Sequence, residues 1–303
     1  MLFRSKKVKR KQGISRRQRR FVIIGLTPIL IVFFVFSVIP IFYSFIMSLF
    51  NHSGFGQAPF VGLDNYVQLV HDTEFLGSLK NTIIFVLIAV NANIVISTLM
   101  AVVIKSIKKR KIRSFFRGWF FIPAVIPIVA LCYVWAIMYQ PSSGIINKML
   151  SLAGIAPVNW LTGSSTALIA IIITTLWCDL GYNIVLILAG MDSVPEMFLE
   201  AASIDGANCV QRFFRITLPL LSRNMLFVSM MTYITYFQAF AQIQIMTKGG
   251  PNNATNVIAY NIYNYAFQYS QMGYASAMAM VLLGIILIIS MVQFFSVKSD
   301  WEY

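Results

Sequence analysis

Long apolar stretches alternate with short polar connections along most of this chain. A membrane-spanning helix needs about 20 mainly apolar residues to cross the hydrocarbon core of a bilayer. Six stretches meet this requirement, at residues 21–46, 83–104, 118–139, 167–190, 225–246 and 274–297. None shows the alternating pattern, about ten residues long, of an outer-membrane barrel strand. The pattern predicts an all-α membrane protein, whose helices satisfy their own backbone hydrogen bonds in lipid.

The composition agrees with this prediction. Of the 303 residues, 58% are hydrophobic and 11% are charged, whereas about a quarter of the residues of a soluble domain are charged. The first apolar run, residues 21–46, is longer than the core of a signal peptide, which has about 7–15 residues, and no small-x-small cleavage site follows it. We therefore expect it to remain as a membrane helix.

Basic residues set the expected direction of the spans, because lysine and arginine favour the cytoplasmic side. Ten of the 24 lie in residues 1–20 and seven in residues 105–117. The remainder on that side are Arg212, Arg215, Arg223 and Lys298, while only Lys80, Lys148 and Lys248 fall on the other. Both termini are thus predicted to be cytoplasmic. The net charge of +14 also suits nucleic acid, but anionic membrane lipid explains clusters at span ends, so we expect no nucleic-acid partner.

The predicted organisation is a basic cytoplasmic tail (1–20), one membrane domain (21–298) and a short cytoplasmic tail (299–303). The outer loops are polar and too short to fold separately. Three cysteines without paired spacing indicate small buried residues. Two histidines argue against a metal centre, and the chain has no phosphate-binding loop for hydrolysing nucleotide by itself.

The cytoplasmic connection at residues 191–222 has more local signals than a plain linker needs. Ser193 and Glu196 have capping-box spacing, and Pro195 between them suits a first helical turn. We expect a short helix through Ile204, with Phe198, Ala201 and Ala202 near one face, and a bend at Gly206.

A second helix should run through Phe213 and end before Pro219. This helix–bend–helix suits the docking of a partner protein, although a hairpin that merely links two spans has the same pattern.

The same loop carries a family resemblance. The string "EAASIDGA" resembles the EAA signature of binding-protein-dependent ABC importer permeases. The matching positions are Glu200, Ala201, Ala202, Asp205, Gly206, Ala207, Ile216, Leu218 and Pro219. The segments "FVGLDNYVQL", "GWFFIPAVIP", "TKGGPNNATNVIAYNIYNYAF" and "MGYASAMAMVLL" are similar to the MalF/UgpA-type branch, the carbohydrate importers. Arg223 departs from the family pattern, and Gln242 and Gln244 weaken inference about the substrate.

The resemblance implies a six-helix bundle of the type I ABC importer permease (MetI-like) fold in the bacterial cell membrane. It also implies four kinds of partner: a second homologous permease, two copies of a cytoplasmic ABC ATPase, an extracytoplasmic sugar-binding protein and a carbohydrate substrate. ATP and Mg would be bound by the ATPase, so this chain is expected to hold no cofactor and to be no enzyme. Glu200 and Asp205 would anchor the loop, Ala201 and Ala202 would allow close approach, and Gly206 would set the bend, with Ile216, Leu218 and Pro219 completing the coupling segment.

Polar residues within the spans are candidates for the substrate path. Asp179 is the one charge inside the six stretches; it either lines the path, or is protonated or satisfied within the bundle by Asn183 or Tyr182. Asn91 and Asn93 line the path or join helices. Tyr233, Phe237, Phe240 and Gln244 follow helical spacing, with Gln238 and Gln242 beside them, which suits sugar stacking or packing against the partner permease.

A secondary transporter and a membrane-embedded enzyme are the two alternatives to transport driven by ATP. A secondary transporter driven by an ion gradient would show several membrane acids or a doubled repeat, and Asp179 stands alone. A membrane-embedded enzyme would need a catalytic cluster, and none is apparent in the sequence.

Overall fold

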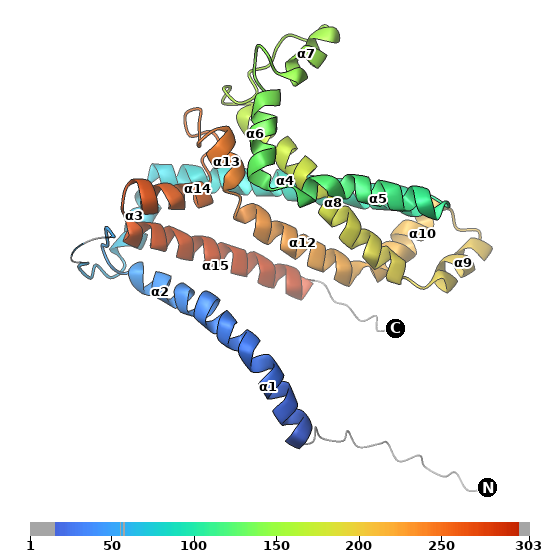
Figure 1. Cartoon of the computed structure of the whole chain (residues 1–303), viewed down its shortest axis with the longest axis horizontal. Coiled ribbons are helices and arrows are strands. Elements are labelled where there is room, and N and C mark those ends of the chain that lie inside the picture. Colours follow the sequence, from blue (N-terminus) through green and yellow to red (C-terminus); the bar gives the residue numbers. More distant parts are fainter. Residues whose placement is uncertain (1–15, 55, 57, 297–303) are drawn as a thin grey trace.

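The computed structural model describes residues 16–54, 56 and 58–296 as a set of helices (Figure 1). The α-helices are α1 (Arg16–Phe33), α2 (Ile39–Met47), α3 (Asp64–His71), α4 (Thr73–Ser106), α5 (Arg110–Val125), α6 (Ile128–Met138), α7 (Ile145–Leu152), α8 (Ala167–Ser193), α9 (Glu196–Ile204), α10 (Cys209–Arg212), α11 (Leu218–Leu220), α12 (Ser222–Phe237), α13 (Ala241–Met246), α14 (Ile258–Tyr263) and α15 (Met272–Ser296). Three π-helical stretches interrupt them: η1 (Phe34–Val38), η2 (Phe213–Thr217) and η3 (Asn264–Gln268).

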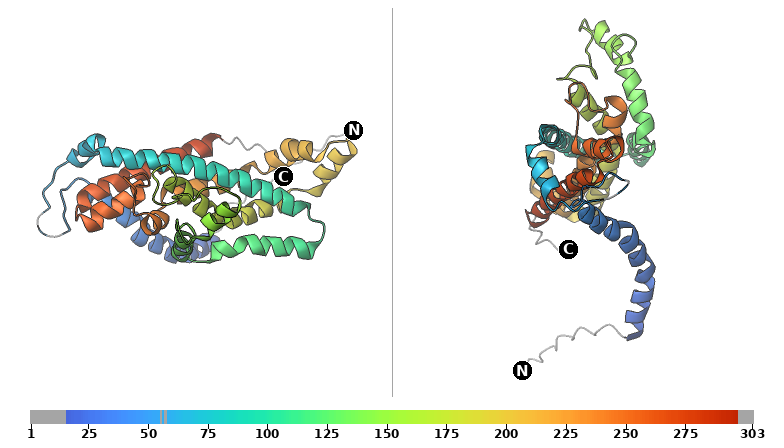
Figure 2. Two further views of the ribbon diagram at one scale, coloured as in Figure 1. Left: turned by 90° about the horizontal axis from the view of Figure 1, so that it is seen from above. Right: turned by 90° about the vertical axis from the view of Figure 1, so that its left-hand side faces the viewer.

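The body of the molecule is a bundle in which α4, α5, α12 and α15 run in roughly the same direction, while α8 crosses them obliquely (Figures 1 and 2). The longest helix, α4, is capped at its start by Asp72, whose side chain accepts hydrogen bonds from the backbone N–H groups of Glu74 at 2.8 Å and Phe75 at 3.2 Å. At the far end of the bundle from α3 and α14 lie α9 and α10 (Figure 1). The bundle therefore has two distinct ends.

Four continuous helical segments in the described part of the chain are long and apolar enough to cross a membrane. They are Arg20–Met47, Thr73–Ser106, Ala167–Ser193 and Met272–Ser296. A fifth crossing results if α5 and α6 act as one span, although they are bent by 93°. The bend falls where Ile126 adopts an extended conformation before Pro127, because a residue before proline disfavours the helical region.

The stretch at residues 225–246 is divided in the structure. The helix α12 ends at Phe237, and α13 begins at Ala241, so the residues between them leave the helical path. Phe240 in this break packs against Tyr260 and Tyr263, with ring centroids 6.3 Å and 5.0 Å away. Six crossings with cytoplasmic ends remain a prediction, and residues 1–15 and 297–303 of the two predicted tails lie outside the described residues.

Two helices approach closely at Gly181 of α8. A β-carbon placed there would lie 1.8 Å from the backbone oxygen of Phe120 in α5. Only glycine fits this contact, so it fixes the distance between α5 and α8 near the middle of the bundle.

Two apolar clusters hold the bundle together. The larger one joins α4, α6, α8, α12, α13, α14 and α15 around buried side chains such as Phe85, Ile171 and Met278. The smaller one lies toward the end of α8 and contains Ile104, Ile187, Val194 and Leu221. The segment from α1 to α2 bends away from the bundle (Figure 2), and its apolar side chains are largely exposed.

Candidate functional site

The loop at residues 191–222 contains the predicted helix and bend. The helix α9 spans Glu196–Ile204. It ends with two hydrogen bonds, from Gly206 N to Ser203 O at 3.2 Å and from Ala207 N to Ala202 O at 2.9 Å. This pair of bonds is a Schellman motif, which requires a left-handed residue after the helix. Gly206 supplies it with a φ of +79°, so the predicted bend at Gly206 is confirmed.

The predicted capping box at Ser193 and Glu196 is wrong. Ser193 is the last residue of α8, and its hydroxyl donates to Gly190 O at 2.7 Å within that helix. The capping box of the loop lies instead at the start of α10. There Gln211 N donates to Asn208 Oδ1 at 2.8 Å, while Asn208 N donates to Gln211 Oε1 at 2.9 Å.

The predicted end of the second helix before Pro219 is also wrong. The helical path continues from α10 through η2 into α11, where Pro219 is the second residue. The Leu218 N–H bonds to Phe213 O, five residues back. A π-helical turn of this kind widens the helix just before the proline, which lacks an N–H of its own.

The tip of the loop exposes both acidic and apolar side chains. Glu200, Ala201 and Asp205 are exposed, whereas Ala202 is buried, so the two alanines do not share one environment. Ile216 and Leu218 are partly buried and Pro219 is exposed. The exposed large apolar residues of the loop are Met197, Phe198, Ile204, Val210 and Phe214. Ile204 is 87% exposed, which is unfavourable in water and favours a protein partner over this surface.

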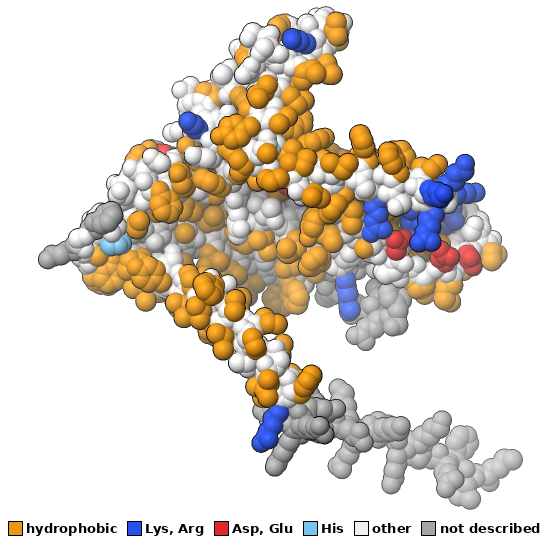
Figure 3. Space-filling model, viewed as in Figure 1, with side chains coloured by type: hydrophobic (Ala, Val, Ile, Leu, Met, Phe, Trp, Pro, Cys, Tyr) orange, Lys and Arg blue, Asp and Glu red, His pale blue; other side chains and the backbone are white. Residues whose placement is uncertain are grey.

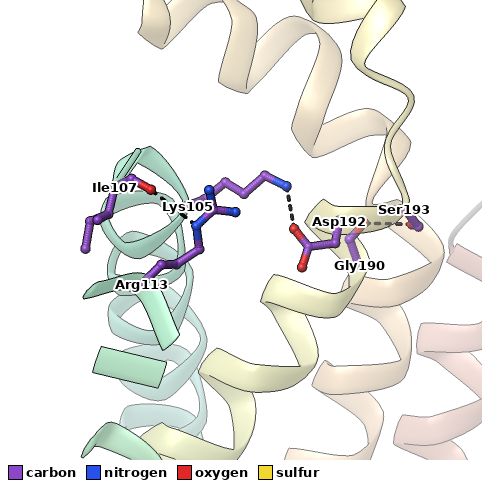
Figure 4. A network of polar contacts seen from close by, with 6 residues as sticks. All are labelled: Lys105, Ile107, Arg113, Gly190, Asp192 and Ser193. Atoms are coloured by element: carbon purple, nitrogen blue, oxygen red, sulfur yellow. Dashed lines mark hydrogen bonds and ion pairs between the residues drawn. The ribbon is translucent and has the colours of Figure 1, made fainter. Parts of the chain in front are cut away.

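The base of the loop is fixed to the bundle. Val194 and Leu221 are buried at its two ends. Lys105, near the end of α4, forms an ion pair with Asp192, near the end of α8 (Figure 4). Figure 3 shows that Lys and Arg side chains gather at this end of the molecule, with acidic side chains beside them. The loop is therefore a rigidly based projection from the basic end of the bundle.

A second candidate site is a cavity of about 290 Å³ within the bundle. Its lining residues come from α5, α8 and α12: Ala124, Asp179, Tyr182, Asn183, Met231, Thr232, Thr235 and Tyr236. Asp179, the one charge predicted inside the spans, lines this cavity.

A chain of buried polar side chains forms the wall behind the cavity and joins three helices. Asn183 Nδ2 of α8 donates to Asn93 Oδ1 of α4 at 2.7 Å and to Thr232 Oγ1 of α12 at 2.9 Å. Asn93 Nδ2 donates to the hydroxyl of Tyr236 at 2.8 Å. Asp179 and Tyr236 both line the cavity. Asn183 uses both of its amide protons on Asn93 and Thr232, so it is not the donor to Asp179 that the sequence suggested.

The other candidates for the substrate path are dispersed. Asn91 is exposed, and its amide donates to Leu87 O of its own helix at 2.6 Å. Tyr233 is partly buried and Phe237 is 4% exposed in the core.

The break after Phe237 separates the other residues that were expected to lie along one face of a single helix. Gln238 is exposed, Phe240 packs on aromatic rings, and Gln242 and Gln244 lie half-buried in α13. The expectation of one helical stripe is therefore wrong.

Sequence reasoning missed Thr232, Thr235 and Tyr236 of the cavity wall. They lie among the apolar and aromatic residues of α12, and no local signal separates Tyr236 from Tyr233. Their one available clue was spacing, because Thr232 and Tyr236 lie four residues apart and so share a helix face.

No group of three or more His, Cys, Asp or Glu side chains that could hold a metal ion occurs in the part of the chain that the structure describes. The cavity therefore shows no metal-binding arrangement among these residues.

Comparisons with known proteins assign the class. Residues 93–298 match the family described as the inner membrane component of binding-protein-dependent transport systems. The probable ABC transporter permease YurN of Bacillus subtilis is 36% identical over 91% of this chain and 96% of its own length. The trehalose/maltose transport permease MalF of Thermococcus litoralis is 32% identical over 91% of this chain and 92% of its own.

A solved bacterial alginate ABC transporter, in complex with a periplasmic protein that binds an alginate pentasaccharide, has the same fold. Its matching chain is 21% identical, with a TM-score of 0.83 over 95% of this chain and 98% of that one. The protein belongs to the family of binding-protein-dependent ABC importer permeases, which are inner-membrane transport components and not enzymes. The type I permease fold expected from the sequence is confirmed, and an ion-gradient-driven transporter is not supported.

Proposed function

We propose that this chain forms half of the translocation path of an ATP-driven carbohydrate importer. The observation that carries the proposal is the exposed EAA loop, fixed at its base and projecting from the basic end of a bundle whose cavity is lined in part by polar side chains. Relatives named for trehalose, maltose and multiple sugars support a carbohydrate as the substrate.

The loop is proposed to dock on a cytoplasmic ABC ATPase, of which the complex holds two copies with their ATP and Mg. Glu200 and Asp205 would form polar contacts with the ATPase, while the exposed apolar residues Met197 and Ile204 would be covered by it. Because the ends of the loop are buried in the bundle, movement of the docked ATPase would be transmitted to α8 and α12 as a rigid-body motion.

The remaining partners follow from the same proposal. A second, homologous permease would complete the cavity, which is lined here by three helices of one chain. An extracytoplasmic sugar-binding protein would deliver the substrate. The basic end of the bundle would face the cytoplasm, because Lys and Arg are retained on that side, and both termini would lie there.

The experiment that tests this function uses the complete complex, reconstituted in liposomes and screened with a panel of carbohydrates. We expect one class of sugar, presented by the binding protein, to stimulate ATP hydrolysis and to be accumulated. Glu200→Lys should remove both effects while the permease stays in the membrane, with Glu74→Lys at the opposite end of the bundle as the control. Stimulation by amino acids or metal ions and by no carbohydrate would refute the proposal.

A further inference from the structure

Several polar side chains in the lining of the cavity around Asp179 have already used their protons within the protein. Asn183 uses its amide group to donate to Asn93 and Thr232. Thr232 donates its hydroxyl proton to Val228 O at 2.7 Å. Tyr236 accepts a bond from Asn93 and has a single proton of its own. The amide protons of Asn183 and the hydroxyl proton of Thr232 are therefore used within the protein.

The carboxylate of Asp179 still has capacity to accept. A carboxylate has about four lone-pair positions, and the one proton of Tyr236 can fill at most one of them. Asp179 lines the cavity, so the remaining positions are available to a ligand there. A ligand that donates several hydrogen bonds fits this wall better than one that only accepts them.

The charge of the cavity lining also disfavours a negatively charged ligand. Asp179 is the one charged side chain among the eight lining residues, and none of the eight is lysine, arginine or histidine. Two negative charges at close range repel strongly in a site partly shielded from water. A carboxylate or phosphate on the ligand would meet no compensating cation from this chain.

We propose that the cavity receives an uncharged, hydroxyl-rich ligand, whose hydroxyl groups donate to Asp179, and that it excludes ligands carrying a carboxylate or phosphate. This inference rests on the proposed function and narrows its substrate class to neutral carbohydrates. The shared fold does not decide the matter, because the neighbouring solved transporter imports the acidic polysaccharide alginate.

The first test measures the charge preference of the cavity without using a substrate. In the complete complex, with Cys132, Cys178 and Cys209 replaced by serine, Thr235→Cys places a thiol in the cavity lining. Its reaction rates are measured with a cationic methanethiosulfonate (trimethylammonioethyl) and an anionic one (sulfonatoethyl). A cysteine at Ser164, an exposed loop position, supplies the reference ratio.

We expect the cation-to-anion rate ratio at residue 235 to exceed the reference ratio by about tenfold, as one nearby charge predicts. Asp179→Asn should return it to the reference value, while Asp179→Glu, which keeps the charge, should preserve it. A ratio equal to the reference in the presence of Asp179, or one unchanged by Asp179→Asn in an assembled complex, would overturn the proposal.

The second test separates this inference from the proposed function. Uptake into liposomes is compared for neutral oligosaccharides and for their uronic acid counterparts, with matched binding protein. We expect uptake of neutral sugars at least tenfold faster. Equal uptake of an acidic oligosaccharide would overturn the inference and leave the carbohydrate function intact. Uptake of no carbohydrate would instead remove the proposed function, whatever the labelling result.

Discussion

Replacing Gly206 by valine perturbs the coupling loop through its backbone alone. Gly206 has a φ of +79°, and a β-carbon added there would meet no other atom within 4 Å. A residue with a β-carbon pays about 1–2 kcal/mol in the left-handed region. The strain therefore falls on the Schellman motif that ends α9, because no side chain has to move.

The size of the effect follows from this strain. A cost of about 1–2 kcal/mol lowers the population of the correctly bent loop roughly 5- to 30-fold. Asparagine visits the left-handed region more readily than other residues, so Gly206→Asn should be affected less than Gly206→Ala. Gly206→Val, with its branched side chain, should be affected most.

Gly154 provides a matched control within the same chain. It follows α7 with a φ of +75°, and a β-carbon there would also meet nothing within 4 Å. Its Schellman bonds run from Gly154 N to Ser151 O at 3.0 Å and from Ile155 N to Leu150 O at 2.9 Å. Gly154→Val thus introduces the same local strain at a distance from the EAA loop.

The assay is co-purification of the ATPase with the membrane complex, combined with ATP-driven uptake. We expect Gly206→Val to lose most of both, Gly206→Asn to retain part, and Gly154→Val to match the wild type. The reasoning would be refuted if Gly206→Val coupled normally, or if Gly154→Val lost the ATPase to the same extent.

Further predictions concern topology, packing and the cavity. Single cysteines at Ser5 and Gly250 should react with impermeant reagents from opposite sides of the membrane, and labelling from one side would contradict the six spans. Gly181→Ala should destabilise the complex by about 1–3 kcal/mol, as measured by its thermal unfolding. Gly118→Ala on α5, where a β-carbon meets nothing within 4 Å, should have little effect. Tyr236→Phe should slow uptake while ATPase co-purification persists, because it removes a hydroxyl group that lines the cavity with Asp179; loss of assembly would contradict this.

The sequence predicted best the features that depend on neighbouring residues. The helix α9 and its end at Gly206 depend on a short apolar pattern and on one glycine, and both occur as expected. The capping box was misplaced, because Ser193 continues α8 for one more residue and bonds within it. The capping-box spacing was read correctly, but it led to a wrong prediction because Ser193 belongs to the longer helix α8.

Features that depend on the meeting of distant segments were not predicted. The break between α12 and α13 has neither proline nor glycine to mark it, and Phe240 there packs against rings about twenty residues away in sequence. The chain of polar side chains behind the cavity joins Asn93, Asn183 and Tyr236 from three helices. By contrast, the bend at Pro127 carried a readable signal, since the residue before a proline disfavours the helical conformation.

The most direct test of the central claim is the energy source for uptake by the complete complex in liposomes. The binding protein and a neutral sugar are supplied on the side where the binding protein docks, and ATP and Mg are supplied to the ATPase subunits. We expect the sugar to accumulate under these conditions. Accumulation should stop when ATP is replaced by a non-hydrolysable analogue. Glu200→Lys should abolish this accumulation. Accumulation driven by a proton or sodium gradient without ATP, and unaffected by Glu200→Lys, would contradict the account.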